Sequence, residues 1–167
     1  MSGAAPNDVA ADDPRQVRAG DLPTPFTAEE IRTASPDGHS VDTVTEEDGL
    51  VIARHRITFL DGDGDSVAMR HVALDDQGEE MGDAAVGRAT WLDLQAHASF
   101  PADASVRTTE SIETPLGEVT CVRYEVRRGE DTLVFWFSVD HPGMPVHRAT
   151  VRDGEPVSIT TVTSIRH

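Results

Sequence analysis

The chain has 167 residues, of which 38% are hydrophobic, enough for a single domain with one sizeable core. Its 30 acidic residues against 14 basic ones give a net charge of −16. Such a field repels nucleic-acid phosphates and anionic lipid headgroups, and no apolar run is long enough to cross a bilayer. We therefore expect no nucleic-acid partner and no membrane span.

Every basic residue apart from histidine is arginine, and lysine is absent. A GC-rich genome explains this composition, and so does adaptation to high salt, in which acidic, lysine-poor surfaces stay hydrated. The two explanations differ in whether the protein unfolds at low salt. The single cysteine, Cys121, excludes an intramolecular disulfide and is expected to be a small buried hydrophobe.

The amino terminus, MSGAAPNDVAADDPRQ, lacks the basic start and apolar stretch of a secretory signal. The chain as written is therefore predicted to be cytoplasmic, although a chain cut after a signal would look the same and be extracytoplasmic. Residues 1–24 are rich in Ala, Asp and Pro and predict a disordered or loosely packed tail. Residues 25–167 then form a single β-rich domain.

The first predicted element is a short helix. Thr27-Ala-Glu-Glu30 has the spacing of a capping box, in which the two side chains satisfy each other's backbone amides. The helix is expected to run to about Ala34 and to end at Ser35-Pro36-Asp37-Gly38.

From Ser40 onward the apolar period changes to two, which predicts antiparallel strands. Val41–Thr45 is a weak first strand, and two alternating runs then flank the acidic loop Asp61–Asp65. With the loop centred on Asp63, three cross-strand pairs are expected: Phe59 with Val67, Ile57 with Met69, and His55 with His71.

A second helix is predicted after a short strand at Met81–Val86. From Arg88 to Phe100 the spacing becomes helical, with Thr90 as the cap and Pro101 at the end. Trp91, Leu94 and Ala98 share its one apolar face. Such a helix must lie across the sheet to bury that face.

The last fifty residues predict two hairpins. Gly129-Glu130 suits a type II′ turn and pairs Val126 with Leu133, Tyr124 with Phe135, and Val122 with Phe137. Asp153-Gly154 indicates a type I′ turn. Pro156 and the Thr/Ser-rich end predict that the last strand lies at an edge of the sheet.

Motifs that carry chemistry are almost absent. The acidic loop has Ser66 and Val72 where a calcium loop needs its Gly and its bidentate Glu. In the expected register, His55 and His71 have Cβ atoms roughly 4.5–5.5 Å apart. A zinc site normally needs a third ligand, and spacing indicates none, although His147 and Asp140 are available. We predict no metal, no cofactor and no catalytic residue.

One stretch is distinctive: Asp140-His-Pro-Gly-Met-Pro-Val146, whose prolines and glycine predict a stiff link between strands, either a structural corner or a rim that contacts ligand. With Glu113–Val119, Val122–Tyr124 and Phe135–Asp140, its Met144-Pro-Val146 resembles the carboxy-terminal part of DUF3108-type proteins and, more loosely, LolA-like lipoprotein-carrier domains. The resemblance covers about residues 105–152. It implies a curved antiparallel half-barrel with helices on the concave side and an apolar hollow. LolA-like carriers bind acyl chains in that hollow.

The fold expected is mainly β: a curved antiparallel meander, or half-barrel, with two short helices, one packed on the concave face. The leading hypothesis is a non-catalytic binding module for a small apolar or lipid-like ligand in that hollow, in a pocket of roughly 300 Å³ or more. Its candidate lining residues, chosen by face, are His55, Met69, His71, Tyr124 and Phe135.

Two alternatives stay open. One is a structural or interaction protein that forms a homodimer through an edge strand, so that either a monomer or a homodimer is expected. The other is a cofactor-independent enzyme of specialised metabolism, with His55, His71 or Tyr124 as the acid/base groups.

Overall fold

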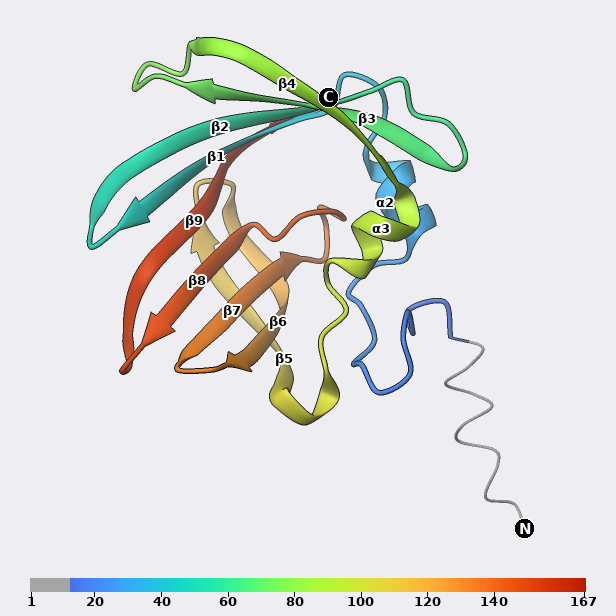
Figure 1. Cartoon of the computed structure of the whole chain (residues 1–167), viewed down its shortest axis with the longest axis vertical. Helices are drawn as coiled ribbons and strands as arrows, with labels where there is room; N and C mark the ends of the chain where they lie inside the picture. Colours follow the sequence, from blue (N-terminus) through green and yellow to red (C-terminus); the bar gives the residue numbers. More distant parts are fainter. Residues whose placement is uncertain (1–12) are drawn as a thin grey trace.

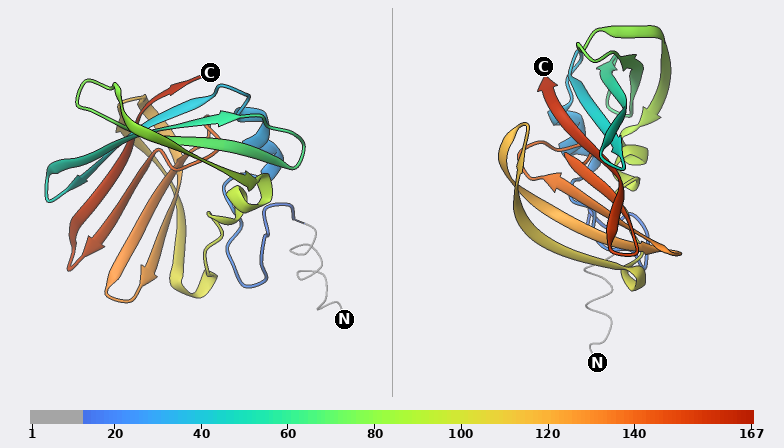
Figure 2. Two further views of the ribbon diagram at one scale, coloured as in Figure 1. Left: turned by 45° about the horizontal axis from the view of Figure 1, so that its top comes forward. Right: turned by 90° about the vertical axis from the view of Figure 1, so that its left-hand side faces the viewer.

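The computed structural model describes residues 13–167 and consists mainly of one antiparallel sheet (Figure 1). Nine strands follow the order β4-β3-β2-β1-β9-β8-β7-β6-β5, and within the described residues no ladder joins β4 to β5. The sheet is thus curved but open, which confirms the predicted fold class (Figure 2). The strands are β1 Ser40–Glu47, β2 Leu50–Leu60, β3 Ser66–Leu74, β4 Glu80–Thr90, β5 Ser105–Thr114, β6 Gly117–Arg128, β7 Asp131–Ser138, β8 His147–Arg152 and β9 Glu155–Arg166.

The hairpin turns follow local sequence. Asp153 and Gly154 both have positive φ angles, 53° and 77°, as a type I′ turn requires. Gly129 alone is positive in its turn, with φ 64°, in keeping with the predicted type II′ geometry. The three predicted pairs between β6 and β7, from Val126–Leu133 to Val122–Phe137, are all confirmed.

Two helices lie on the open side of the curved sheet, between the β3–β4 half and the β5–β7 half (Figure 1). Helix α2, Ala28–Ala34, begins at the predicted Thr27–Glu30 capping box. Helix α3, Trp91–Ala96, begins at Thr90, whose hydroxyl accepts a hydrogen bond from the Asp93 amide. With the 3-10 turn Ala102–Ala104, α3 belongs to the connection that carries the chain from β4 to β5.

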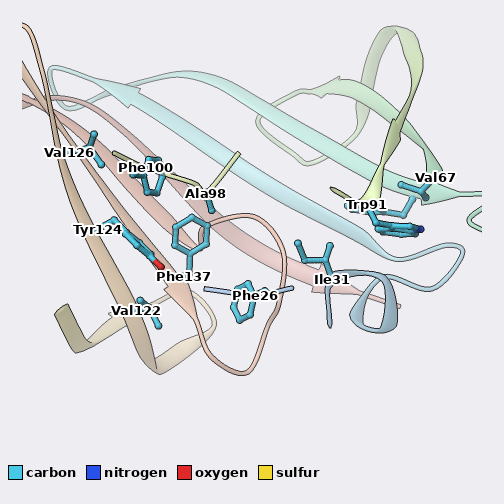
Figure 3. Close-up of a cluster of buried hydrophobic side chains, with 11 residues drawn as sticks. Phe26, Ile31, Val67, Trp91, Ala98, Phe100, Val122, Tyr124, Val126 and Phe137 are labelled. Atoms are coloured by element: carbon cyan, nitrogen blue, oxygen red, sulfur yellow. The ribbon is translucent and has the colours of Figure 1, made fainter. Parts of the chain in front are cut away.

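The main hydrophobic core lies between the helices and the concave face of the sheet (Figure 3). It joins side chains from both halves of the sheet, from both helices and from the segments beside them. Its buried members are Phe26, Ile31, Phe59, Val67, Trp91, Ala98, Phe100, Val122, Tyr124, Val126 and Phe137. A second buried cluster consists of Val41, Val119, Cys121, Val146 and Val162.

The register between β2 and β3 differs from the prediction by two residues. Phe59 pairs with Met69 and Ile57 with His71, so His55 lies opposite Ala73 and not opposite His71. The loop is longer than expected because the Asp63 carboxylate accepts hydrogen bonds from the amides of Asp65 and Ser66, closing its own turn. A shift of two residues keeps every side chain on its face but separates the two histidines.

The second helix is shorter than predicted, and the strand before it is longer. Strand β4 continues to Thr90, beyond the expected end at Val86, because Ser66 to Leu74 on β3 gives it a full-length partner. Helix α3 ends at Ala96, well before Pro101. Trp91 and Ala98 nevertheless reach the core, and Leu94 packs against it, as the shared apolar face predicted.

The last strand is not at an edge, so this prediction was wrong. Strand β9 lies in the middle of the sheet, paired with β8 on one side and β1 on the other. Pro156 is tolerated because the ladder with β1 extends only to Ser158, so no partner on that side needs an amide from residue 156. The edges of the sheet are β4 and β5, so the homodimer hypothesis, which needs an edge strand, stays a prediction for these two strands.

The segment from residue 13 to Phe26 runs along the helices and the β6 side of the core. Leu22 donates its amide hydrogen to the Phe100 carbonyl over 2.8 Å, and Thr24 is fully buried. Residues 1–12 of the predicted tail lie outside the described residues.

Gln95 on α3 holds this segment in place. Its buried amide nitrogen donates to the Pro14 carbonyl over 2.8 Å and to the Thr24 hydroxyl over 3.0 Å. Its amide oxygen accepts a 3.0 Å hydrogen bond from the first residue of α2, Ala28. One side chain thus links both helices and the amino-terminal segment.

We expect Gln95→Ala to lower the free energy of unfolding by about 2 kcal/mol, because the Pro14 carbonyl, the Ala28 amide and the buried Thr24 hydroxyl lose a hydrogen-bond partner at once. Urea denaturation followed by circular dichroism measures this. The control is Leu92→Ala on the same helix, where the side chain is 66% exposed and little should change. A loss no larger than that of the control would contradict the proposed link.

Candidate functional site

A pocket of about 550 Å³ lies on the concave side of the sheet and is the candidate site. It is lined by residues from strands of both halves of the sheet, from both helices and from the segment between β7 and β8. Most of the lining is apolar: Pro25, Phe26, Ile31, Ile57, Phe59, Met69, Gly87, Ala89, Leu94, Ala98, Phe135, Phe137, Gly143, Met144 and Pro145. The size and lining are typical of a small-molecule site.

Three of the five residues named from sequence line this pocket: Met69, His71 and Phe135. His55 is exposed near the middle of β2 and is not among the lining residues. Tyr124 is fully buried in the core instead. Strand alternation predicts which face of the sheet a side chain is on. It does not predict how far along the strand the pocket lies, and this distance separates Met69, His71 and Phe135 from His55 and Tyr124.

Tyr124 has a structural role. Its ring packs against Phe100 and Phe137, and its hydroxyl donates a 2.7 Å hydrogen bond to the Pro23 carbonyl. Burial raises the pKa of the Tyr124 hydroxyl, with a smaller opposing effect from Arg107. The hydrogen bond from Tyr124 to Pro23 joins the amino-terminal segment to β6.

Sequence reasoning did not predict that Gly87 lines the pocket. Gly87 of β4 pairs with Met69, so both positions face the concave side. A Cβ at Gly87 would meet no atom within 4 Å, so the missing side chain leaves space at the pocket. A glycine inside an alternating strand was the available signal.

The stiff link between β7 and β8 lines the pocket as well. Gly143, Met144 and Pro145 contribute to its wall. The two prolines limit the backbone freedom of this wall, and Gly143 has a φ of 140°, a conformation that favours glycine. The stretch singled out in the sequence therefore is a corner that also forms part of the candidate site.

Only five of the lining residues are polar, and none of them is acidic. They are Gln95, two arginines (Arg88 and Arg148) and two histidines (His71 and His97), and no aspartate or glutamate is among them. The two arginines and two histidines are all exposed, whereas Gln95 is buried. The basic groups thus mark the solvent side of an otherwise apolar pocket.

A smaller cavity of about 240 Å³ lies beside the carboxyl end of α2, lined by residues that include His39, His141 and His167. The Nδ1 atoms of His39 and His167 are 3.0 Å apart. Burial, and to a lesser degree the neighbouring His167 and His141, lowers the pKa of His39. In residues 13–167, no three His, Cys, Asp or Glu side chains are placed to hold a metal ion.

Cys121 is a packing residue. It is completely buried in the second cluster, and burial, with a smaller contribution from Glu110, raises the pKa of its thiol to about 11. A thiol held protonated at neutral pH is a poor nucleophile.

No protein-family model matches the chain, and no curated protein is similar to it in sequence. The resemblance to DUF3108-type and LolA-like proteins therefore stays a prediction. Among solved structures, the chain is similar to a protein described as exported, with a YmcC-like fold, from Bacteroides fragilis NCTC 9343. The TM-score is 0.49 at 11% identity, over 80% of this chain and 97% of that one. A second similar structure is a hypothetical protein from Chlamydia trachomatis, with a TM-score of 0.48 at 9% identity, over 84% of this chain and 92% of that one.

Neither described helix, α2 nor α3, has the length or apolar character to cross a membrane.

Proposed function

We propose that this protein is a non-catalytic binding module that holds a small apolar or lipid-like ligand in the concave pocket. The observation that carries the proposal is the pocket of about 550 Å³, whose lining is mainly apolar and comes from both halves of the sheet. Large apolar concavities with a few polar groups are the usual sites of small-molecule binding.

The arrangement of the walls supports this role. Phe59 and Phe137 are buried members of the main core that also face the pocket, so part of the wall is rigidly packed. Met69, Leu94 and Met144 are only partly buried, and methionine adapts its shape to apolar partners. A ligand would remove apolar surface from water without reorganising the core.

Gly87→Phe tests the proposal by filling the pocket. The new side chain would stand beside Met69 on the same face of the sheet, its Cβ would meet no atom within 4 Å, and the φ of residue 87 is not positive. We expect the folded protein to lose at least tenfold in affinity for 1-decanol, because the aromatic ring occupies the ligand's volume. Isothermal titration calorimetry measures this, and circular dichroism checks the fold.

The matched control is Val86→Phe. Residue 86 neighbours Gly87 on β4 and is 65% exposed, and it belongs to the opposite face of the strand. This variant adds the same ring outside the pocket and should bind 1-decanol like the parent protein. If the parent protein does not bind 1-decanol, or if both variants bind it equally well, the pocket is not a ligand site.

A further inference from the structure

The basic groups at the pocket's solvent side indicate which class of ligand the pocket takes. We infer that the ligand is a single-chain amphiphile with a carboxylate head, whose apolar tail lies in the pocket and whose head pairs with Arg148. This inference rests on the proposed function and specifies its ligand.

Charge distribution is the first observation. The chain carries 30 acidic residues, yet none is among the twenty residues that line the pocket. The ionised side chains of the lining are Arg88 and Arg148, accompanied by the imidazoles of His71 and His97. In a protein of net charge −16, an acid-free pocket with two guanidinium groups is a local reversal of the overall field.

The two arginines differ in their surroundings. Arg88 donates to the Ser66 hydroxyl and to the Asp61 carbonyl, each over 2.8 Å, and lies 3.5 Å from the Asp63 carboxylate. Its donors are largely used by the acidic loop. Arg148 makes no side-chain hydrogen bond or ion pair with any residue from 13 to 167. Its guanidinium therefore has donors available for a ligand.

Position places Arg148 next to apolar surface. It lies on β8 directly opposite Phe135, which lines the pocket, and neighbouring residues in a ladder point to the same face. The stem of an arginine packs on apolar surface while its head stays in water. A ligand head held there keeps its charge solvated while its tail extends toward Phe59, Met69 and Phe137.

A carboxylate is the head group that this geometry fits best. The planar guanidinium offers two parallel N–H donors, which match the two oxygens of a carboxylate. One arginine with free donors balances one negative charge, as a carboxylate carries. A cationic head would find no acidic partner in the lining, and an alcohol would leave the charge of Arg148 unpaired.

The test compares three probes with the same tail: decanoate, 1-decanol and decyltrimethylammonium, each below its critical micelle concentration at neutral pH. Isothermal titration calorimetry on the full chain should give decanoate the highest affinity, about tenfold above 1-decanol, as expected for hydrogen bonds to a charged group. The net charge by itself would favour the cationic probe, so the expected order opposes the overall field.

Arg148→Gln should remove the decanoate advantage, a loss of about tenfold, and leave the affinity for 1-decanol unchanged. The control is Arg128→Gln, an equal charge change at an exposed arginine that is not among the pocket residues. It should leave the order of the three probes intact.

The two proposals fail in different ways. If 1-decanol and decanoate bind equally, or if Arg148→Gln weakens both alike, the carboxylate inference is wrong while apolar binding stands. If decyltrimethylammonium binds best, the overall field decides and the inference is again wrong. If no probe binds, the proposed function itself is overturned.

Discussion

Trp91→Ala is expected to lower the free energy of unfolding by about 4 kcal/mol, the usual cost of truncating a buried aromatic side chain. Trp91 is 3% exposed and belongs to the main core, where it lies beside Val67 (Figure 3). Because domains of this size are stable by only about 5–15 kcal/mol, this one change removes a large share.

The indole also positions the acidic loop between β2 and β3. Its Nε1 donates a 2.8 Å hydrogen bond to the Asp63 carbonyl, and a Cβ at Gly62 would lie 3.3 Å from its Cζ2 atom. The loop thus approaches the ring closely, which favours glycine at that position. Truncation should therefore loosen the loop as well as leave a cavity.

Urea denaturation followed by circular dichroism measures the loss in the free energy of unfolding, and two further variants serve as controls. Leu92→Ala removes the next residue on α3, which is 66% exposed, and should change stability little. Trp91→Phe keeps most of the packing but loses the hydrogen bond, at an expected cost nearer 1–2 kcal/mol. If Trp91→Ala cost no more than Leu92→Ala, Trp91 would not be a packed member of the main core.

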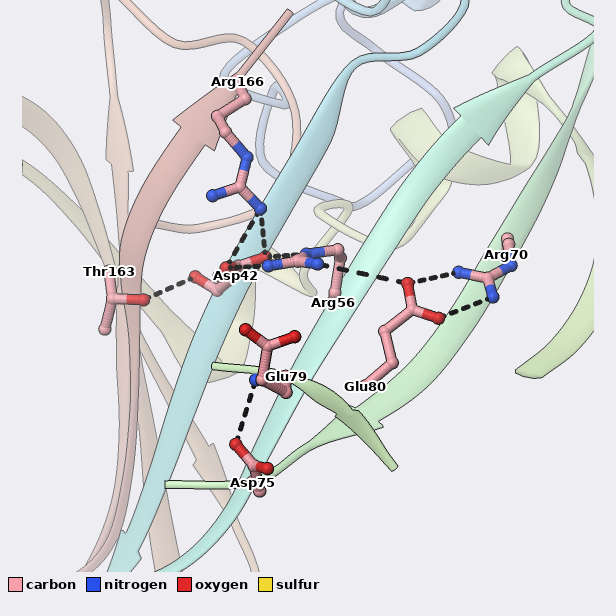
Figure 4. Close-up of polar contacts among 8 residues, drawn as sticks. All are labelled: Asp42, Arg56, Arg70, Asp75, Glu79, Glu80, Thr163 and Arg166. Carbon is pink, nitrogen blue, oxygen red and sulfur yellow. Dashed lines mark hydrogen bonds and ion pairs between the residues drawn. The ribbon is translucent and has the colours of Figure 1, made fainter. Parts of the chain in front are cut away.

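Asp42→Ala is the second large change, with an expected loss of about 3 kcal/mol in the free energy of unfolding, because Arg56 loses both of its hydrogen bonds and keeps only the Glu80 carboxylate, 4.0 Å away, as a partner in the described part of the chain. The Asp42 carboxylate accepts hydrogen bonds of 2.8 and 3.0 Å from Arg56 and lies 3.3 Å from Arg166 (Figure 4). The side chains of Asp42 and Arg56 are only 12% and 21% exposed.

The double variant Asp42→Leu with Arg56→Leu separates the net contribution of the ion pair from the cost of leaving Arg56 charged without Asp42. Removing both charges leaves no buried ion, so it should be less destabilised than Asp42→Ala. Asp131→Ala, which breaks the more exposed pair with Arg152, serves as the surface control and should have a small effect. Equal losses in the two alanine variants would show that the Asp42 pair contributes no more than a surface contact.

The Asp42 network also sets part of the response to acid. Burial of the carboxyl raises its pKa, but the hydrogen bonds and charges of Arg56 and Arg166 together outweigh burial, so the pKa lies below its ordinary value of 3.8. As pH falls below that value, the unfolded chain binds the proton first. The contribution to stability is therefore complete above pH 3.8 and is lost as pH falls through the lower folded-state pKa.

Two histidines extend this acid response upward. Burial lowers the pKa of His39 and of His147 from 6.5, so protonation of the unfolded chain begins to reduce stability below that pH. The free energy of unfolding, measured at a series of pH values, should therefore fall in two pH ranges, one below 6.5 and one below 3.8. In Asp42→Ala only the fall below pH 3.8 should become smaller. If the fall below pH 6.5 became smaller instead, the assignment would be contradicted.

Much of the fold could be predicted because it depends on neighbours in sequence. The Thr27–Glu30 capping box, the turns at Gly129 and Asp153-Gly154, and the β6–β7 register all follow from residues a few positions apart. A two-residue turn sets register directly, whereas the longer loop at Asp61–Asp65 leaves several registers open. The β2–β3 pairing was missed for that reason.

For the candidate site, strand alternation predicted which face of the sheet each side chain is on, but not whether it lies at the pocket, in the core or outside both. Met69, His71 and Phe135 lie at the pocket, while Tyr124 is in the core and His55 lies outside. Arg148 had no local pattern that distinguished it, and the only signal at Gly87 was a glycine inside an alternating strand. Their proximity arises because β4 and β8 belong to opposite halves of a curved sheet.

The sequence by itself determined the β-rich fold class, the two carboxy-terminal hairpins, the helix caps and the apolar face of each element, because those depend on local backbone preferences and on periodicity. Only the tertiary structure decided that β9 pairs with β1 at the centre of the sheet, and that the helices leave a pocket on its concave side. The reason is physical: pairing of distant strands and the space left between packed layers depend on how all elements fit together. No short stretch of residues encodes that fit.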